Sequence, residues 1–184
     1  MEEETAVDGR LIDAFNAAGA MARAGRHQEA LGGYRNVLHL ARKGNLPASL
    51  EFLATTRMRA GFCLMDLGRY EESLQEFAEA RTHQKALSLE GRYELAFATG
   101  NALGALGRLQ ECFGSLIDAV SLAEDMDDYT DRPARCWMNI LAHGDRAGDR
   151  AFVAEKAAIA LNTARLRRMD GLAAVARRFL AAGS

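Results

Sequence analysis

A seven-residue stretch recurs along the chain at nearly constant spacing. The copies read GRHQEAL at 25–31, GRYEESL at 68–74, GRLQECF at 107–113 and a more divergent GDRAFVA at 148–154. Their leading glycines lie 43, 39 and 41 residues apart. A supersecondary unit repeated at such a period buries its apolar face only by stacking on its neighbours, so the spacing predicts a repeat architecture.

Each copy predicts two helices joined by a tight turn. The glycine supplies a left-handed backbone at the end of the first helix, and a polar residue then leads into the second. In the second helix, small residues bracket a larger apolar one at helical spacing, which lets paired helices approach closely. The three sets of positions are Ala30, Ser73, Cys112 and Val153; Tyr34, Phe77, Leu116 and Ala157; and Val37, Ala80, Ala119 and Ala160.

The residue composition agrees with a helical chain. Of 184 residues only 2 are proline and 7% are aromatic, which argues against an all-β fold. Alanine, leucine, glutamate and arginine dominate, and all are good helix formers. A chain of this length buries roughly 70% of its unfolded surface and needs no disulfide or metal. The pattern predicts helices over about 8–24, 27–43, 48–67, 70–86, 88–106, 109–126, 132–147, 149–168 and 171–182.

These positions resemble the tetratricopeptide repeat (TPR) family. The resemblance rests on the turn glycines, on small residues before them at Ala18, Gly61 and Gly100, and on aromatics at Tyr70 and Trp137. The period of about 41 residues exceeds the common 34. It is similar to the extended repeats of kinesin light chains and of bacterial regulators of the MalT or Rap type.

The resemblance implies an all-α, right-handed superhelical solenoid that forms one domain over residues 1–184. Four helix hairpins are expected over about 8–43, 48–86, 88–126 and 132–168, followed by a capping helix over 171–182. A terminal helix of this kind seals the last repeat. We therefore expect no appended catalytic or DNA-binding domain.

The resemblance also implies a concave groove lined by the first helix of each repeat. Apolar side chains there, several of them adaptable methionines, suit an amphipathic helix or an extended peptide. An asparagine amide donates and accepts at once, which suits a peptide bond. The same spacing also fits side chains that pack against each other in a core. The predicted groove residues are Phe15, Met58, Arg59, Phe62, Met65, Phe97, Asn101, Met138 and Asn139.

No motif for catalysis or cofactor binding stands out. The four histidines are scattered, and none has metal-ligand spacing. We interpret the stretch 143–146 as the surface end of a helix. The acidic segment 124–128 does not fit a calcium loop, and no glycine-rich phosphate loop follows a predicted strand. We therefore expect no metal, no cofactor and no enzyme activity.

Charge and cysteine usage predict a cytoplasmic protein. The net charge of −2 argues against a general nucleic-acid binder. Residues 151–184 carry six bases and two acids, which we interpret as a solvated face, with an acidic partner as the alternative. The three cysteines are isolated, the first residues are acidic, and no apolar run approaches a membrane-spanning length.

The sequence thus favours a non-catalytic module that binds a peptide or helix of a partner protein in its groove. Two alternatives stay open. One is a regulatory or sensor protein that responds to a peptide or small ligand. The other is a self-associating scaffold, because an apolar strip can also pair two copies into a homodimer.

Overall fold

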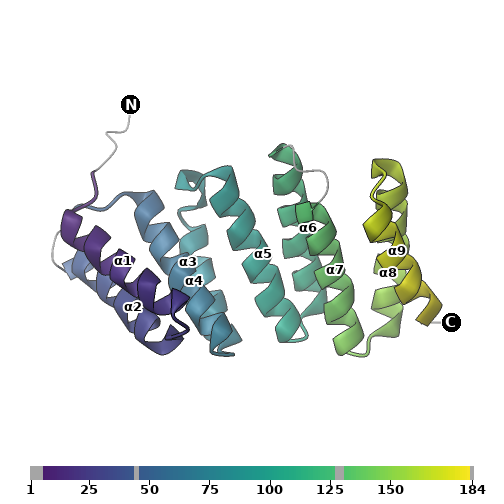
Figure 1. The fold of residues 1–184 in the computed structure, drawn as a ribbon, viewed down its shortest axis with the longest axis horizontal. Helices are drawn as coiled ribbons and strands as arrows, with labels where there is room; N and C mark the ends of the chain where they lie inside the picture. Colours follow the sequence, from purple (N-terminus) through teal and green to yellow (C-terminus); the bar gives the residue numbers. More distant parts are fainter. Residues whose placement is uncertain (1–5, 44–45, 127–130, 183–184) are drawn as a thin grey trace. The chain divides into compact units, whose positions relative to one another are not determined.

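The computed structural model describes residues 6–43, 46–126 and 131–182, and the regular structure in these ranges is entirely helical (Figure 1). The predicted bounds differ from the observed ones by at most two residues, except at the end of the fourth helix. The helices are α1 (Gly9–Arg23), α2 (His27–Lys43), α3 (Leu50–Asp66), α4 (Tyr70–Arg81), α5 (Leu89–Ala105), α6 (Leu109–Asp125), α7 (Asp131–Arg146), α8 (Arg150–Arg167) and α9 (Asp170–Ala182). A short 3-10 helix, η1 (Gln84–Ala86), follows α4.

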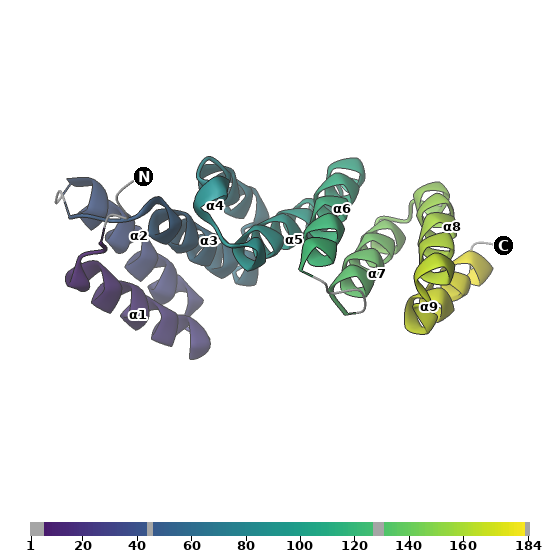
Figure 2. The same cartoon turned by 90° about the horizontal axis from the view of Figure 1, so that it is seen from above.

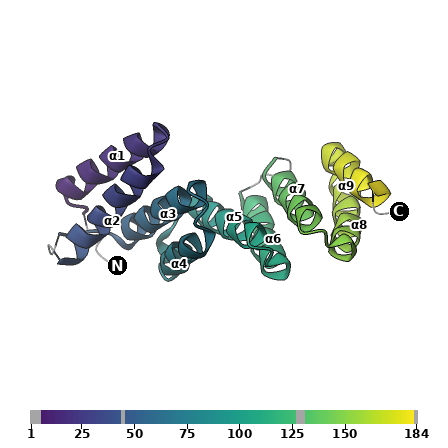
Figure 3. The same cartoon turned by 90° about the horizontal axis from the view of Figure 1, so that it is seen from below.

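The chain divides into two compact units, Met1–Gly91 and Arg92–Ser184. In unit 1 the hairpins α1–α2 and α3–α4 pack side by side through α2 and α3 (Figure 3). In unit 2 helix α7 packs against α6 and α8, and α9 lies along α8 (Figure 2). The single domain expected over residues 1–184 stays a prediction.

The four turn glycines adopt the predicted left-handed backbone, with φ values of 75°, 72°, 75° and 70°. The residue after each glycine donates its backbone N–H to a carbonyl five positions earlier, which is the Schellman motif. This arrangement satisfies carbonyls that the end of a helix leaves unpaired. The donor–acceptor pairs are Arg26–Met21 at 3.0 Å, Arg69–Leu64 at 2.8 Å, Arg108–Leu103 at 2.9 Å and Asp149–Gly144 at 3.1 Å.

Small residues meet large ones where the hairpin helices cross, as predicted. A Cβ added at Gly61 would lie 2.4 Å from Cε1 of Phe77, and one added at Gly100 would lie 2.6 Å from Cγ of Leu116. In the fourth hairpin Gly144 has this role, since a Cβ there would lie 2.7 Å from Cδ1 of Phe152. This repeat has Leu141 at the position that Gly61 and Gly100 occupy in theirs. The close approach is instead made one turn later, at Gly144.

The predicted fourth helix runs to residue 86, but α4 ends at Arg81. The Thr82 hydroxyl donates to the carbonyl of Glu79 at 2.7 Å. After η1 the backbone of Leu87 is extended, and its side chain is only 4% exposed. The chain therefore leaves the helix to bury an apolar side chain that a continued helix would have placed elsewhere.

Polar side chains begin several helices. The Ser49 hydroxyl accepts from the backbone N–H of Phe52 at 3.1 Å, and an Asp149 carboxylate oxygen accepts from that of Phe152 at 2.9 Å. Proline suits the first turn of a helix, but Pro47 lies before the Ser49 cap and outside that turn. Aspartate is also a common cap residue, which predicts a capping role for Asp131, but residues 127–130 before it lie outside the described residues.

Candidate functional site

Helices α5 and α7 of unit 2 bring aromatic rings and guanidinium groups together. The Tyr93 and Phe97 rings stack one helical turn apart, with centroids separated by 5.7 Å. The Arg132 guanidinium lies 5.2 Å from the Tyr93 centroid, and that of Arg135 lies 5.0 Å from the Phe97 centroid. These are favourable cation–π distances, so each ring holds one guanidinium in place.

A hydrogen-bonded group of three side chains lies one turn further along both helices. The Asn139 Nδ2 donates to Oδ1 of Asn101 at 2.7 Å, and Nε2 of His143 lies 3.3 Å from the same oxygen. An amide oxygen only accepts hydrogen bonds, so His143 carries its proton on Nε2 and donates it. The side-chain amide oxygen of Asn101 therefore points at α7.

The His143 ring is a buried, neutral anchor for this group. It is 6% exposed, and burial, with a further contribution from the charge of Arg146, lowers its pKa. The ring packs on Gly104, where an added Cβ would lie 2.3 Å from its Cγ. We interpreted this stretch of sequence as a surface helix end, and that interpretation is wrong for His143.

The arrangement leaves one amide donor and one amide acceptor for a ligand. Within the described part of the chain, no partner takes Nδ2 of Asn101 or Oδ1 of Asn139. Both side chains are partly exposed. A donor beside an acceptor is the complement of a backbone N–H and C=O. We call the residues Tyr93, Phe97, Asn101, Arg132, Arg135, Asn139 and His143 the α5–α7 face.

The groove residues predicted in unit 1 divide between core and surface. Met58 is 2% exposed, so it packs in the interior and offers almost no area to a ligand. The partly buried Phe15 packs its ring against Tyr34 and Phe52, with both centroid distances 5.4 Å. Met58 and Phe15 were predicted to line a groove, but much of their apolar surface packs within unit 1.

The remaining predicted residues keep exposed area. The Arg59 guanidinium lies 5.4 Å from the Phe62 centroid, and the Phe62 ring meets Phe77 edge-on. Phe62 and Met65 are partly exposed. In unit 2, Met138 is 37% exposed on α7. The structure thus joins the predicted Asn101 and Asn139 directly, places Phe97 one turn away on the same face, and pairs Arg59 with Phe62.

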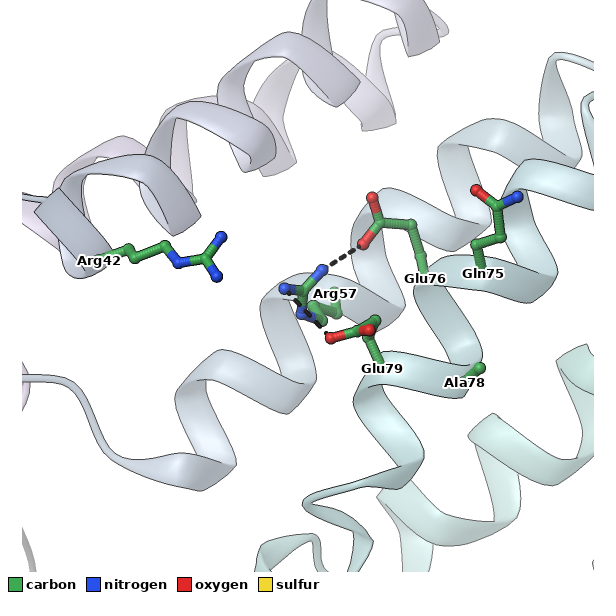
Figure 4. A pocket seen from close by; sticks show the side chains of 6 residues that line it. All are labelled: Arg42, Arg57, Gln75, Glu76, Ala78 and Glu79. Atoms are coloured by element: carbon green, nitrogen blue, oxygen red, sulfur yellow. Dashed lines mark hydrogen bonds and ion pairs between the residues drawn. The ribbon is translucent and has the colours of Figure 1, made fainter.

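A cleft that the sequence did not reveal lies between α2, α3 and α4 of unit 1, with a volume of about 560 Å³ (Figure 4). Arg57 reaches Glu76 at 2.9 Å and Glu79 at 3.6 Å, whereas Arg42 stands apart on α2. Because Arg57 pairs with both glutamates, the cleft offers fewer unsatisfied polar groups than the α5–α7 face.

The cysteines are buried, and their environment keeps the thiols protonated. Burial raises the pKa of Cys112 to about 11 and that of Cys136 to about 12. Across the described residues, no three side chains of histidine, cysteine or acidic type gather as metal ligands. Among these residues there is also no helix with the length and apolar character required to span a bilayer.

No protein-family model and no curated protein matches the sequence. Solved structures do match the fold. A putative kinesin light chain with TPR-like repeats from Podosopora anserina has a TM-score of 0.63 and 17% identity, covering 100% of this chain and 95% of that one.

Two further matches are structures of complexes. The Yersinia enterocolitica type III secretion chaperone SycD, in complex with a peptide of the translocator YopD, has a TM-score of 0.57 and 13% identity, covering 76% of this chain and 95% of that one. A Rap protein complexed with Competence and Sporulation Factor has a TM-score of 0.61 and 15% identity. That match covers 96% of this chain but 53% of Rap.

The molecule therefore has the all-α fold of TPR-like helical repeat proteins, as the sequence predicted. At these identities the likeness concerns the fold.

Proposed function

We propose that the chain is a non-catalytic module that binds an extended peptide segment of a partner protein on the α5–α7 face. The observation that carries this proposal is the Asn101–Asn139 pair, whose free donor and acceptor suit one backbone peptide group. His143 fixes the orientation of the pair before any ligand arrives. Such preorganisation reduces the entropy lost on binding.

One of the similar folds was solved with a peptide, which supports a peptide ligand, and a second was solved in complex with a named factor. SycD was solved with a peptide of YopD, and Rap with Competence and Sporulation Factor. Flanking apolar contacts are proposed at the exposed edges of Phe97 and Met138, because adaptable apolar side chains accept varied ligand residues. For unit 1, taken by itself, we propose a separate peptide contact at the exposed parts of Phe15, Phe62 and Met65, with the Arg59 guanidinium lying over the Phe62 ring.

We propose that this binding takes place in the cytoplasm. The three cysteines are free and buried, which suits a reducing compartment.

The test is selection of a phage-displayed random decapeptide library on the full chain, followed by affinity measurements on the recovered peptides. Asn101→Asp is the decisive variant, because its carboxylate still accepts from Asn139 and His143 but donates nothing to a ligand. A lost hydrogen bond that leaves its partner unpaired costs roughly tenfold in affinity. We expect at least that loss with Asn101→Asp and with Asn139→Ala.

The matched control is Asn162→Ala, at an exposed position on α8. It should bind the recovered peptides like the wild type, and all variants should keep their helical circular dichroism. Recovery of no peptide, or equal affinity across the folded variants, would contradict the proposed function.

A further inference from the structure

We propose that the α5–α7 face selects peptides with an acidic side chain two residues away from the backbone group held by the asparagine pair, and that Arg135 binds this acid. The inference rests on the proposed function and adds the chemistry of the ligand. It follows from three observations on Arg135: it has no carboxylate partner among the described residues, its guanidinium lies over the Phe97 ring, and it is one helical turn from Asn139.

Arg135 is an exposed cation without a carboxylate partner among the described residues. Two exposed arginines elsewhere in the chain differ from Arg135 because each forms an ion pair. Arg10 pairs with Asp8 at 2.9 Å, and Arg167 pairs with Glu124 at 2.9 Å. The unpaired guanidinium can therefore accept a ligand carboxylate without first losing an internal ion pair.

Phe97 holds the Arg135 guanidinium in place. The guanidinium carbon lies 5.0 Å from the ring centroid, and the ring is itself held by its stacking on Tyr93. A planar guanidinium supported by a ring keeps its N–H edge available for a two-point bond to a carboxylate. The stacking also reduces the side-chain entropy that binding would remove.

The spacing sets the register of the ligand. Arg135 and Asn139 are one turn apart on α7, about 6 Å along the helix axis. Two residues of an extended chain span about 6.6 Å, and their side chains point to the same side. A peptide whose backbone group sits at the asparagine pair therefore brings the side chain two residues away to Arg135.

The experiment uses peptides recovered from the decapeptide library on the wild-type chain and on Arg135→Gln. Glutamine keeps a polar side chain but has no charge and no guanidinium fork. We expect enrichment of aspartate or glutamate at one position with the wild type and loss of that enrichment with Arg135→Gln. Arg178→Gln, which removes an exposed charge on α9, is the matched control and should keep it.

A double-mutant cycle on one recovered peptide then isolates the contact. Replacing its acid by the amide should weaken binding to the wild type about tenfold, as expected for a charge-assisted bond. The same replacement should have little effect on Arg135→Gln. Moving the acid by one position should cost as much as removing it, since the side chain then points to the opposite side of the peptide.

The outcomes separate the two proposals. Enriched peptides without an acidic preference, or an acidic preference that persists in Arg135→Gln, would overturn this inference while the peptide-binding function stands. If the wild type enriches no peptide at all, both fail.

Discussion

At the residue scale, adding one methyl group to a helical glycine has opposite effects on stability, depending on whether the position is packed or open. A Cβ at Gly61 would lie 2.4 Å from the Phe77 ring, whereas one at Gly32 meets nothing within 4 Å. Overpacking costs about 1–3 kcal/mol, and replacing an open helical glycine by alanine gains up to about 1 kcal/mol. We expect Gly61→Ala to lower the free energy of unfolding and Gly32→Ala to raise it, as measured by urea denaturation. If both variants raised the free energy of unfolding, α3 and α4 would have to move apart at little cost.

The buried His143 makes stability depend on pH. Burial lowers its pKa from the ordinary value of 6.5, so the unfolded chain binds the proton more readily than the folded one. The contribution of this residue is therefore complete above about pH 6.5 and is lost as the pH falls toward the folded pKa. We expect a decrease in the free energy of unfolding between pH 7.5 and 5.5.

His143→Gln tests this expectation, because its side-chain amide still donates to Asn101 but does not titrate. The pH-dependent decrease should be smaller in this variant than in the wild type, and the exposed His39→Gln should behave like the wild type. Identical pH slopes in the wild type and His143→Gln would assign the effect to other groups.

At the scale of the element, one left-handed helix end among the described residues is formed by a residue other than glycine. Arg168 closes α8 with φ 56° and ψ 41°, and the N–H of Met169 bonds to the carbonyl of Ala164 at 2.8 Å. The left-handed conformation costs a residue with a Cβ about 1 kcal/mol. Arg168→Gly should therefore raise the free energy of unfolding by about that amount.

Gly107→Ala is the converse change, at φ 75°. It should lower the free energy of unfolding by about 1 kcal/mol, in the same urea titration that is used for Arg168→Gly. If Arg168→Gly is neutral, the arginine side chain must make a compensating contact.

Helix positions were largely predictable because most helix boundaries depend on local chemistry. A glycine at the end of the first helix, or a serine such as Ser49 at a start, acts within one turn of the chain. The end of α4 was missed because it depends on the burial of Leu87, which tertiary packing decides. Local signals thus give the elements, and packing adjusts their ends.

At the scale of the whole molecule, the repeat predicted the fold but only part of the candidate site. Asn101 lies six residues before its turn glycine and Asn139 nine residues before its own, a difference of about one helical turn, so spacing placed both on one side of their helices. The roles of His143 and Arg135 depend on contacts with Gly104 and Phe97, which are 38 or 39 residues distant in sequence. No helical period reveals such pairs, because they depend on how two hairpins stack.

Repeat architecture also predicts which helices a destabilising substitution affects most. Stability in stacked repeats is roughly a sum of local terms, so regions open with different free energies. Gly61→Ala disturbs the α3–α4 hairpin of unit 1. Hydrogen–deuterium exchange should therefore accelerate in α1–α4 by a larger factor than in α7–α9. Gly100→Ala, which crowds Leu116 in unit 2, should reverse this order. Equal acceleration of both units by either variant would instead require the chain to unfold as one cooperative body.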